Sequence, residues 1–239
     1  ALRLEDLLTM SSGLNFSEVY QPGGDATAML FVEPNAAAYA EQSPLLNKPG
    51  EHFSYSSGTT NLLASLYQRQ AGSNLSENLA HLYGKFYRPL GMENPLFEVD
   101  SSGGFVGSSY FYASARDWAR IGQLMLGKGE INGQRLLAEQ WVSRAVQPNR
   151  SLNDQAYGYQ FWLNAGAAGS SPRWADLPAD AYAALGNRKQ VMMMLPSQNA
   201  LILRLGWSEA GYPTNDNFAQ LLQAVEAVDN NPSPELSTE

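Results

Sequence analysis

The sequence has 239 residues, a formal net charge of −8 and no cysteine. A chain of this length is large enough to bury one hydrophobic core, whereas the lack of cysteine excludes disulfides, thiolate nucleophiles and cysteine metal sites. The acidic balance, with no basic run, argues against binding to a nucleic-acid backbone, and no apolar run approaches the roughly 18 residues of a membrane span.

The first half of the chain has the periodicity of helices. Leu4, Leu7 and Leu8 share a helical face before the sequence SSGL interrupts it. The alanine-rich segment 25–42 is predicted to be helical and to be kinked or divided at Pro34, because proline disrupts a helix interior.

Two later helices have recognisable ends. The apolar stripe that contains Leu62 and Leu66 predicts a helix ending at Gly72, which suits a C-cap. The segment SARDWARIGQLMLGKG begins with a capping-box pattern, in which Ser114 is the N-cap and Asp117 follows three residues later. The next segment, RLLAEQWVSRAV, is read as a continuation of the helical run.

The pattern changes near Tyr157. The sequence YGYQFWL alternates aromatic and smaller residues, and QVMMML and ALILRLG, joined by PSQN, predict two strands connected by a turn. A last helix, roughly 215–228, is expected to cover the sheet. The side chains expected to face it are Phe218, Leu221, Leu222 and Val225.

The predicted fold class is therefore α+β in one domain, 1–228. Residues 1–150 are expected to be mainly helical and 151–228 to form strands and a C-terminal helix, whereas the polar, proline-containing end, 229–239, is predicted to be disordered.

The two histidines do not indicate a metal or catalytic site. His52 and His81 lie in different segments without the i, i+4 spacing that places two imidazoles on one helix face. No G-x-S-x-G motif accompanies them. They are read as surface or hydrogen-bonded side chains, and no metal site is predicted.

Six segments together resemble a known superfamily. They are LRLEDLLTMSSGL, PGEHFSYSSGTTNLLASLY, PLGMENPLFEVDSSGG, YFYASARDWARIGQLML, YGYQFWL and ALGNRKQVMMMLPSQNALILRLG. Their order is similar to that in β-lactamase-related serine hydrolases, from about Leu4 to Trp207, with a motif style nearest the nylon-oligomer (6-aminohexanoate-dimer) hydrolase branch. The resemblance implies a β-lactamase/DD-peptidase-like antiparallel sheet flanked by helices, and no cofactor.

The resemblance places Tyr55 at the tyrosine of the family's Tyr-x-Asn or Tyr-x-Ser motif and Ser57 at its third position. It implies that the phenol works with a lysine to move a proton between the nucleophilic serine and the leaving group. A free tyrosine has a pKa of about 10, so a nearby ammonium must favour the phenolate. Serine in place of asparagine at position 57 counts against β-lactam hydrolysis. The alternative is that Tyr55 only caps the edge of the core.

The family's Lys- or His-x-Gly motif is placed at Asn187, Arg188 and Lys189, with lysine where the family has glycine. In this register Asn187 and Arg188 would contact substrate, and the backbone N–H of Gln190 would stabilise the oxyanion. The alternatives are a register shifted by one residue, or an exposed start of a strand with solvated charges.

Three further residues are candidates for substrate contact. Tyr20 and Asp25 lie in a loop where the nylon-oligomer branch has substrate-facing side chains, although they are also ordinary loop residues. Trp174 is expected on a connection near the pocket rim, where it would either stack on an acyl group or pin the loop.

The family's nucleophile, the serine of Ser-x-x-Lys, has no counterpart in this sequence. The four lysines, Lys48, Lys85, Lys128 and Lys189, each follow a residue other than serine three positions earlier. The resemblance implies that the motif lies upstream, so the chain is expected to be the later part of a longer hydrolase and inactive by itself.

The predicted function is a serine hydrolase that acts on a small ester or amide by an acyl-serine mechanism. The alternative is a non-catalytic protein that binds ligands in the same cleft. The resemblance further implies export to the bacterial periplasm or beyond rather than a cytoplasmic location.

Overall fold

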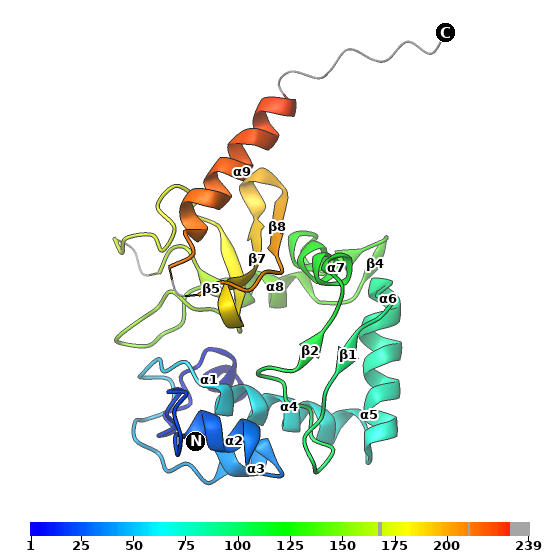
Figure 1. The fold of residues 1–239 in the computed structure, drawn as a ribbon, viewed down its shortest axis with the longest axis vertical. Helices are drawn as coiled ribbons and strands as arrows, with labels where there is room; N and C mark the ends of the chain where they lie inside the picture. Colours follow the sequence, from blue (N-terminus) through cyan, green and yellow to red (C-terminus); the bar gives the residue numbers. More distant parts are fainter. Residues whose placement is uncertain (167–168, 210, 230–239) are drawn as a thin grey trace.

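The computed structural model describes residues 1–166, 169–209 and 211–229, with side chains up to residue 225. Helices α1 to α4 gather at one end of the molecule, and a four-stranded sheet with α9 forms the other end (Figure 1). The elements of the first part are α1 (Leu4–Leu8), α2 (Asp25–Phe31), α3 (Ala36–Glu41), α4 (Ser57–Ala71), α5 (Leu75–Leu82), a π-helical turn (Tyr83–Tyr87), α6 (Arg88–Leu90), β1 (Leu96–Phe97), β2 (Phe111–Tyr112), α7 (Ala115–Leu126), β3 (Glu130–Ile131), β4 (Gln134–Arg135) and α8 (Glu139–Ala145).

The second part contains the main sheet. Its elements are β5 (Trp162–Leu163), β6 (Tyr182–Gly186), a 3₁₀ turn (Asn187–Lys189), β7 (Gln190–Leu195), a 3₁₀ turn (Pro196–Gln198), β8 (Ala200–Arg204) and α9 (Thr214–Asp229). The strand order is β5-β6-β7-β8 and every pair is antiparallel. The α+β fold class is confirmed, whereas the division into one domain stays a prediction.

The predicted helix boundaries in the first part are confirmed at three places. The segment around Pro34 separates α2 from α3. Helix α4 begins where the Ser56 hydroxyl accepts a hydrogen bond from Thr59 N, and its C-cap is Gly72. Helix α7 begins at the predicted cap, because Ser114 Oγ accepts from Asp117 N.

The expected helix 135–146 is wrong in its first part. Asn132 and Gly133 both have positive φ, 52° and 72°, which makes a two-residue hairpin turn between β3 and β4. This turn pairs Glu130 with Arg135, so Arg135 belongs to a strand and α8 begins only at Glu139.

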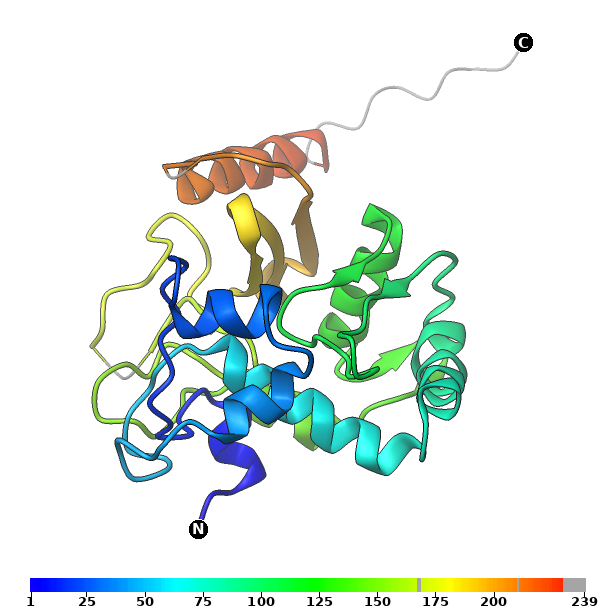
Figure 2. The same cartoon turned by 60° about the horizontal axis from the view of Figure 1, so that its bottom comes forward.

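Strand β7 is covered by helices on both faces. Its odd-numbered residues 191, 193 and 195 pack with Phe218 of α9, while Met192 and Met194 pack with Met125 of α7 and with α8. Figures 1 and 2 show α9 on the side of the sheet remote from α1 to α4. Because both faces are buried, β7 reads as a continuous apolar run instead of alternating.

The four residues predicted to face the sheet from α9 divide into two pairs. Phe218 is buried and Leu222 packs against the same core cluster. Leu221 and Val225 are wrongly predicted, since they are 51% and 56% exposed. The end of α9 projects past the sheet (Figure 1), in agreement with the exposure of Val225. The predicted tail lies outside the described residues, apart from Asp229.

Within the described part of the chain, no helix combines the length and the apolar character needed to cross a bilayer.

An ion pair joins the first helix to α8. Arg144 Nη2 lies 2.6 Å from Glu5 Oε1, and the Tyr159 hydroxyl donates to the same oxygen at 3.2 Å. The hydrogen bond from Arg144 is the main cause that lowers the pKa of Glu5 below 4.5, against a desolvation that raises it.

We expect this pair to add a pH-dependent contribution to stability. Because the folded pKa of Glu5 is lowered, the contribution is present above pH 4.5 and is lost as the pH falls below it. Both side chains are about a third exposed, so Glu5→Gln should cost only about 0.5–1 kcal/mol at pH 7. Urea unfolding at pH 7 and pH 3 measures the difference, with Glu51→Gln in the more exposed Lys48 pair as the control. An equal loss at both pH values would contradict this assignment.

Candidate active site

The segment that carries Tyr55 is held in place from both sides. Ser54 N donates to Met10 O at 2.8 Å, and Phe53 exchanges two hydrogen bonds with the Asn153 side chain, at 2.8 and 2.9 Å. The backbone of residues 53–56 is therefore held in place where it leads into the first turn of α4.

The ring of Tyr55 is fixed in an aromatic cluster. It stacks on Trp162, with ring centroids 5.4 Å apart and planes at 21°, and meets Tyr157 edge-on at 6.1 Å. Such contacts position a ring as well as bury it. Packing alone thus explains the ring, while the hydroxyl donates to and accepts from no residue in the described ranges.

The environment of Tyr55 favours the neutral phenol. Desolvation by burial raises its pKa above 10, and the Glu18 carboxylate raises it further. No cation in the described part of the chain contributes to this shift. The ammonium that the proton-transfer role requires is therefore not supplied by the residues around Tyr55.

Ser57 is held by an acidic residue that the sequence analysis did not single out. Ser57 Oγ donates to Glu18 Oε1 at 2.6 Å, and Ser57 N donates to Glu18 Oε2 at 2.7 Å. Glu18 thus holds the N-terminal residue of α4, where a negative charge is favourable. The feature of the sequence that could have drawn attention to Glu18 is that it is the only acidic residue between Asp6 and Asp25.

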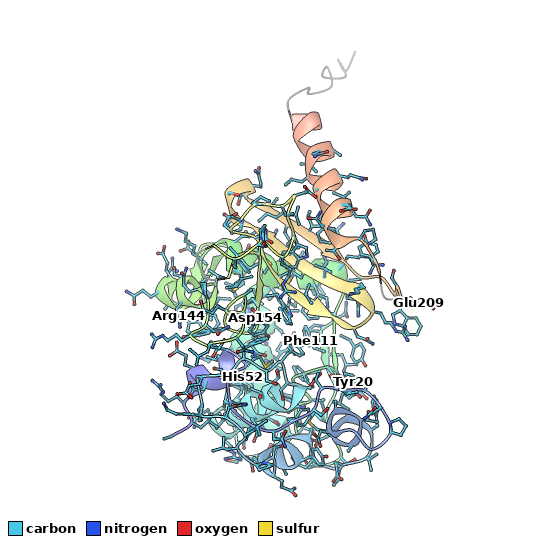
Figure 3. All side chains as sticks on the ribbon, turned by 90° about the vertical axis from the view of Figure 1, so that its left-hand side faces the viewer. Tyr20, His52, Phe111, Arg144, Asp154 and Glu209 are labelled. Carbon is cyan, nitrogen blue, oxygen red and sulfur yellow. The ribbon has the colours of Figure 1, made fainter. Side chains whose placement is uncertain are left out.

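Tyr20 reaches the same carboxylate. Its hydroxyl donates to Glu18 Oε1 at 3.0 Å and lies 3.5 Å from Ser57 Oγ, while most of the residue is exposed. Desolvation of the hydroxyl, with the charge of Glu18, raises the pKa of Tyr20 to about 12. Figure 3 shows Tyr20 on the helical part of the molecule, below the sheet. The structure thus brings Tyr20 and Ser57 together.

Asp25 is occupied by structural contacts. Its two carboxylate oxygens accept from Ser17 N at 2.8 Å and from the Tyr39 hydroxyl at 2.9 Å. It opens α2, so both oxygens tie the loop to the helices.

Asn187, Arg188 and Gln190 lie at the hairpin between β6 and β7. Arg188 and Lys189 have positive φ, 56° and 65°, a conformation that glycine adopts without strain. Gln190 N donates to Asn187 O within the turn. That N–H is occupied, so the geometry does not support its predicted role as an oxyanion donor.

The open edge of β6 provides another donor. Strand β5 pairs only with Tyr182 and Ala183, and Asn164 N donates to Ala181 O. Because backbone groups alternate along a strand, Leu185 directs its N–H and C=O to the same edge, beyond the end of β5. Trp162 pairs with Ala183, so the edge begins next to the residue on which Tyr55 stacks.

Trp174 is not at a pocket rim. It is 6% exposed and belongs to the core cluster under the sheet. Its backbone N–H donates to Asn164 Oδ1 at 2.6 Å, and its carbonyl accepts from Asn164 Nδ2 at 3.0 Å. The substrate-stacking prediction is thus contradicted by burial, and of the two alternatives Trp174 pins its loop.

Neither histidine joins this site. His81 Nδ1 lies 2.9 Å from the Tyr67 hydroxyl, and His52 Nε2 lies 3.4 Å from Asn153 Nδ2. The described residues contain no group of three or more His, Asp or Glu side chains arranged to hold a metal ion.

The family model described as Beta-lactamase matches residues 1–224. The chain belongs to the beta-lactamase family. That family comprises serine hydrolases.

Solved structures agree with this fold. A Bacillus anthracis protein, whose name gives a provisional assignment as a 6-aminohexanoate-dimer hydrolase, is 21% identical with a TM-score of 0.72; the alignment covers 98% of this chain and 63% of that one. A beta-lactamase/D-alanine carboxypeptidase of Yersinia pestis is 21% identical with a TM-score of 0.61, over 94% and 70%. A penicillin-binding protein homologue of Caulobacter crescentus is 15% identical with a TM-score of 0.63, over 93% and 70%.

The beta-lactamase-family chain thus spans less than two thirds of the length of the Bacillus anthracis protein. At these identities the likeness establishes the fold, and the activity is argued separately below.

Proposed function

We propose that this chain forms the acid/base part of a serine hydrolase that cleaves an ester or amide through an acyl-serine intermediate. The supporting observation is the placement of Tyr55. Its ring is fixed by Trp162 and Tyr157, and its hydroxyl has no hydrogen-bond partner in the described ranges. It stacks on Trp162, whose partner on β6, Ala183, lies two residues before Leu185.

In this proposal Tyr55 carries the proton of the reaction. As a serine oxygen attacks the substrate carbonyl carbon, its proton passes to Tyr55 in its phenolate form, and the resulting phenol then delivers the proton to the departing alcohol or amine. Water repeats the sequence to release the acid. The N–H of Leu185 would donate to the oxyanion in place of Gln190, while Asn187, Arg188 and Tyr20 would contact substrate at the mouth of the site.

The proposal requires a nucleophile and a cation that these 239 residues do not supply. No Ser-x-x-Lys occurs in the sequence, and burial raises the pKa of Tyr55. A segment with that motif would provide both, because its ammonium would lower the phenol pKa towards neutrality. Glu18 and Ser57 would keep the start of α4 in position for it.

The substrate class follows from the motif and from the relatives. Ser57, in place of asparagine, disfavours β-lactams. The names of the relatives include a 6-aminohexanoate-dimer hydrolase and a D-alanine carboxypeptidase, which supports amides among the substrates.

A ligand-binding protein without catalysis is the second candidate. It is favoured by the neutral state of Tyr55 and by the missing nucleophile motif. In that case the surroundings of Tyr55 would bind ligand without reacting.

Labelling by a fluorophosphonate separates the two functions. We expect the isolated 239-residue chain to gain no mass, and the full-length product of its gene to gain one adduct on the serine of a Ser-x-x-Lys motif. Intact mass spectrometry followed by peptide mapping measures both. An adduct on the isolated chain would contradict the fragment interpretation, and no adduct on the folded full-length product would favour the binding protein.

A further inference from the structure

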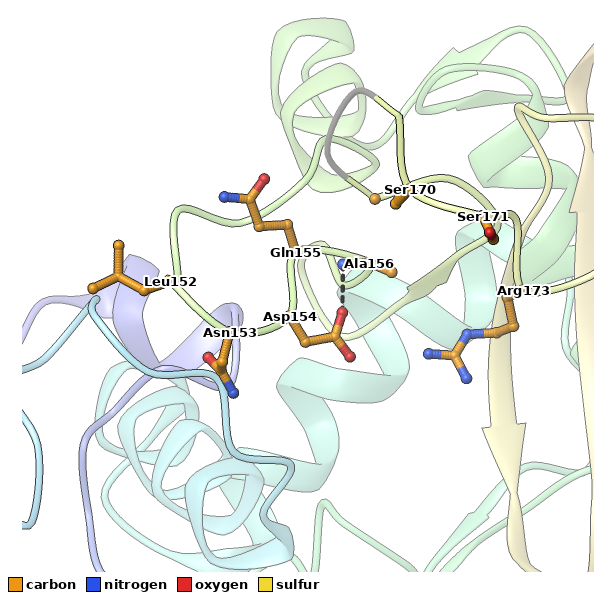
Figure 4. Close-up of a pocket in the computed structure, with 9 residues that line it drawn as sticks. Leu152, Asn153, Asp154, Gln155, Ala156, Ser170, Ser171 and Arg173 are labelled. Carbon is orange, nitrogen blue, oxygen red and sulfur yellow. Dashed lines mark hydrogen bonds between the residues drawn. The ribbon is translucent and has the colours of Figure 1, made fainter.

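A polar hollow of about 570 Å³ lies beside the aromatic cluster that holds Tyr55. It is lined by the loop 152–156 and by Gly166, Ser170, Ser171 and Arg173 (Figure 4). Asp154 and Arg173 enter it from these two sides, so the hollow carries one acidic and one basic group.

The guanidinium of Arg173 lies over an indole ring and is bonded to none of the described residues. It lies over the Trp162 ring, 4.4 Å from the centroid, and makes no hydrogen bond or ion pair to any residue in the ranges 1–166, 169–209 and 211–229. Desolvation lowers the pKa of Arg173, against the attraction of Asp154. An arginine whose five donors are bonded to none of the described residues is suited to an anionic ligand.

The groups around Arg173 are fixed before any ligand binds. Arg173 N donates to Asn164 O at 2.9 Å, and the next residue, Trp174, is buried. Across the hollow, Asn153 is bonded to both backbone groups of Phe53, and Asp154 Oδ1 accepts from Ala156 N at 2.9 Å. The backbone at Arg173 and the Asn153 and Asp154 side chains are therefore held in place before a ligand binds.

Trp162 connects this hollow to the candidate active site. One ring contacts both the Arg173 guanidinium and the Tyr55 phenol. The hollow and the candidate active site thus share the Trp162 ring.

We propose that the hollow binds a carboxylate of the substrate through Arg173. A guanidinium binds a carboxylate through two parallel charge-assisted hydrogen bonds. Asp154 accepts an N–H beside that carboxylate, so the favoured ligands are N-acylated amino acids. The word substrate rests on the proposed function, but binding of the carboxylate does not require turnover.

Binding of N-acetylglycine tests this site. In ¹⁵N-resolved NMR titrations of the 239-residue chain, N-acetylglycine should shift the Trp162 indole N–H and Arg173 Nε–H signals, and neutral N-acetylglycinamide should bind at least about tenfold more weakly. Arg173→Gln should weaken N-acetylglycine by a similar factor. Arg88→Gln, which removes an arginine placed over Tyr83 instead, should have no effect.

Three results would overturn the proposal: no shift with N-acetylglycine, equal binding of the amide, or unchanged binding in Arg173→Gln. Arg173→Lys keeps the positive charge but lacks the planar pair of donors, so it should lose part of the affinity for N-acetylglycine. Residual binding by this variant would show that it folds, and the partial loss would show that donor geometry contributes. None of these results depends on fluorophosphonate labelling, so a failed carboxylate site and a failed hydrolase are distinguishable.

Discussion

Tyr55→Phe in the full-length gene product is expected to slow acylation by a fluorophosphonate or ester substrate by about 100- to 10,000-fold, the range of general acid–base catalysis. Phenylalanine keeps the stacking on Trp162 and the edge contact with Tyr157. The substitution therefore removes the hydroxyl alone. Because that hydroxyl bonds to no described residue, stability should change by less than about 0.5 kcal/mol.

The matched control is Tyr83→Phe. Tyr83 is a half-exposed phenol in the π-helical turn, and phenylalanine keeps its ring under Arg88. Acylation rates by stopped-flow or timed mass spectrometry, with thermal unfolding of each variant, separate chemistry from stability. Equal rates for Tyr55→Phe and wild type, with folding unchanged, would make Tyr55 a packing residue.

The parts of the fold that the sequence predicted are those set by local rules. Ser114 marks the start of α7 and Gly72 the end of α4, because caps act through backbone groups a few residues away. The hairpin of β7 and β8 follows in the same way from two apolar runs joined by a turn. The Asn132–Gly133 hairpin obeys an equally local rule and was within reach of the sequence.

The candidate site was less predictable because it depends on contacts between distant residues. The motif indicated Tyr55, but the 39-residue separation between Glu18 and Ser57 leaves no local pattern. The burial of Trp174 depends on Asn164, which sits in the sequence FWLNAG as an unremarkable polar residue. The residue whose N–H could donate to the oxyanion depends on the strand register. A register shift of one residue turns every backbone N–H and C=O to the opposite edge of the strand.

Asn164→Ala is expected to lower the free energy of unfolding by about 3 kcal/mol or more, because it strips partners from several buried groups at once. The Asn164 amide donates to the carbonyls of Trp174, Leu177 and Pro178 at 2.8–3.2 Å, and its oxygen accepts from Trp174 N. The residue is 1% exposed, so water does not replace these bonds without disturbing the loop.

Urea unfolding compares this variant with Asn15→Ala, which truncates an exposed asparagine without a side-chain hydrogen bond and should change stability by less than about 0.5 kcal/mol. Asn164→Asp distinguishes lost donors from lost volume: it keeps the size but places a carboxylate against three carbonyls, and should be at least as destabilising as alanine. Because Asn164 Oδ1 holds the backbone N–H of Trp174, the residue next to Arg173, Asn164→Ala should also weaken N-acetylglycine binding. Near-wild-type stability of Asn164→Ala would show that the loop 173–178 is held by the burial of Trp174 alone.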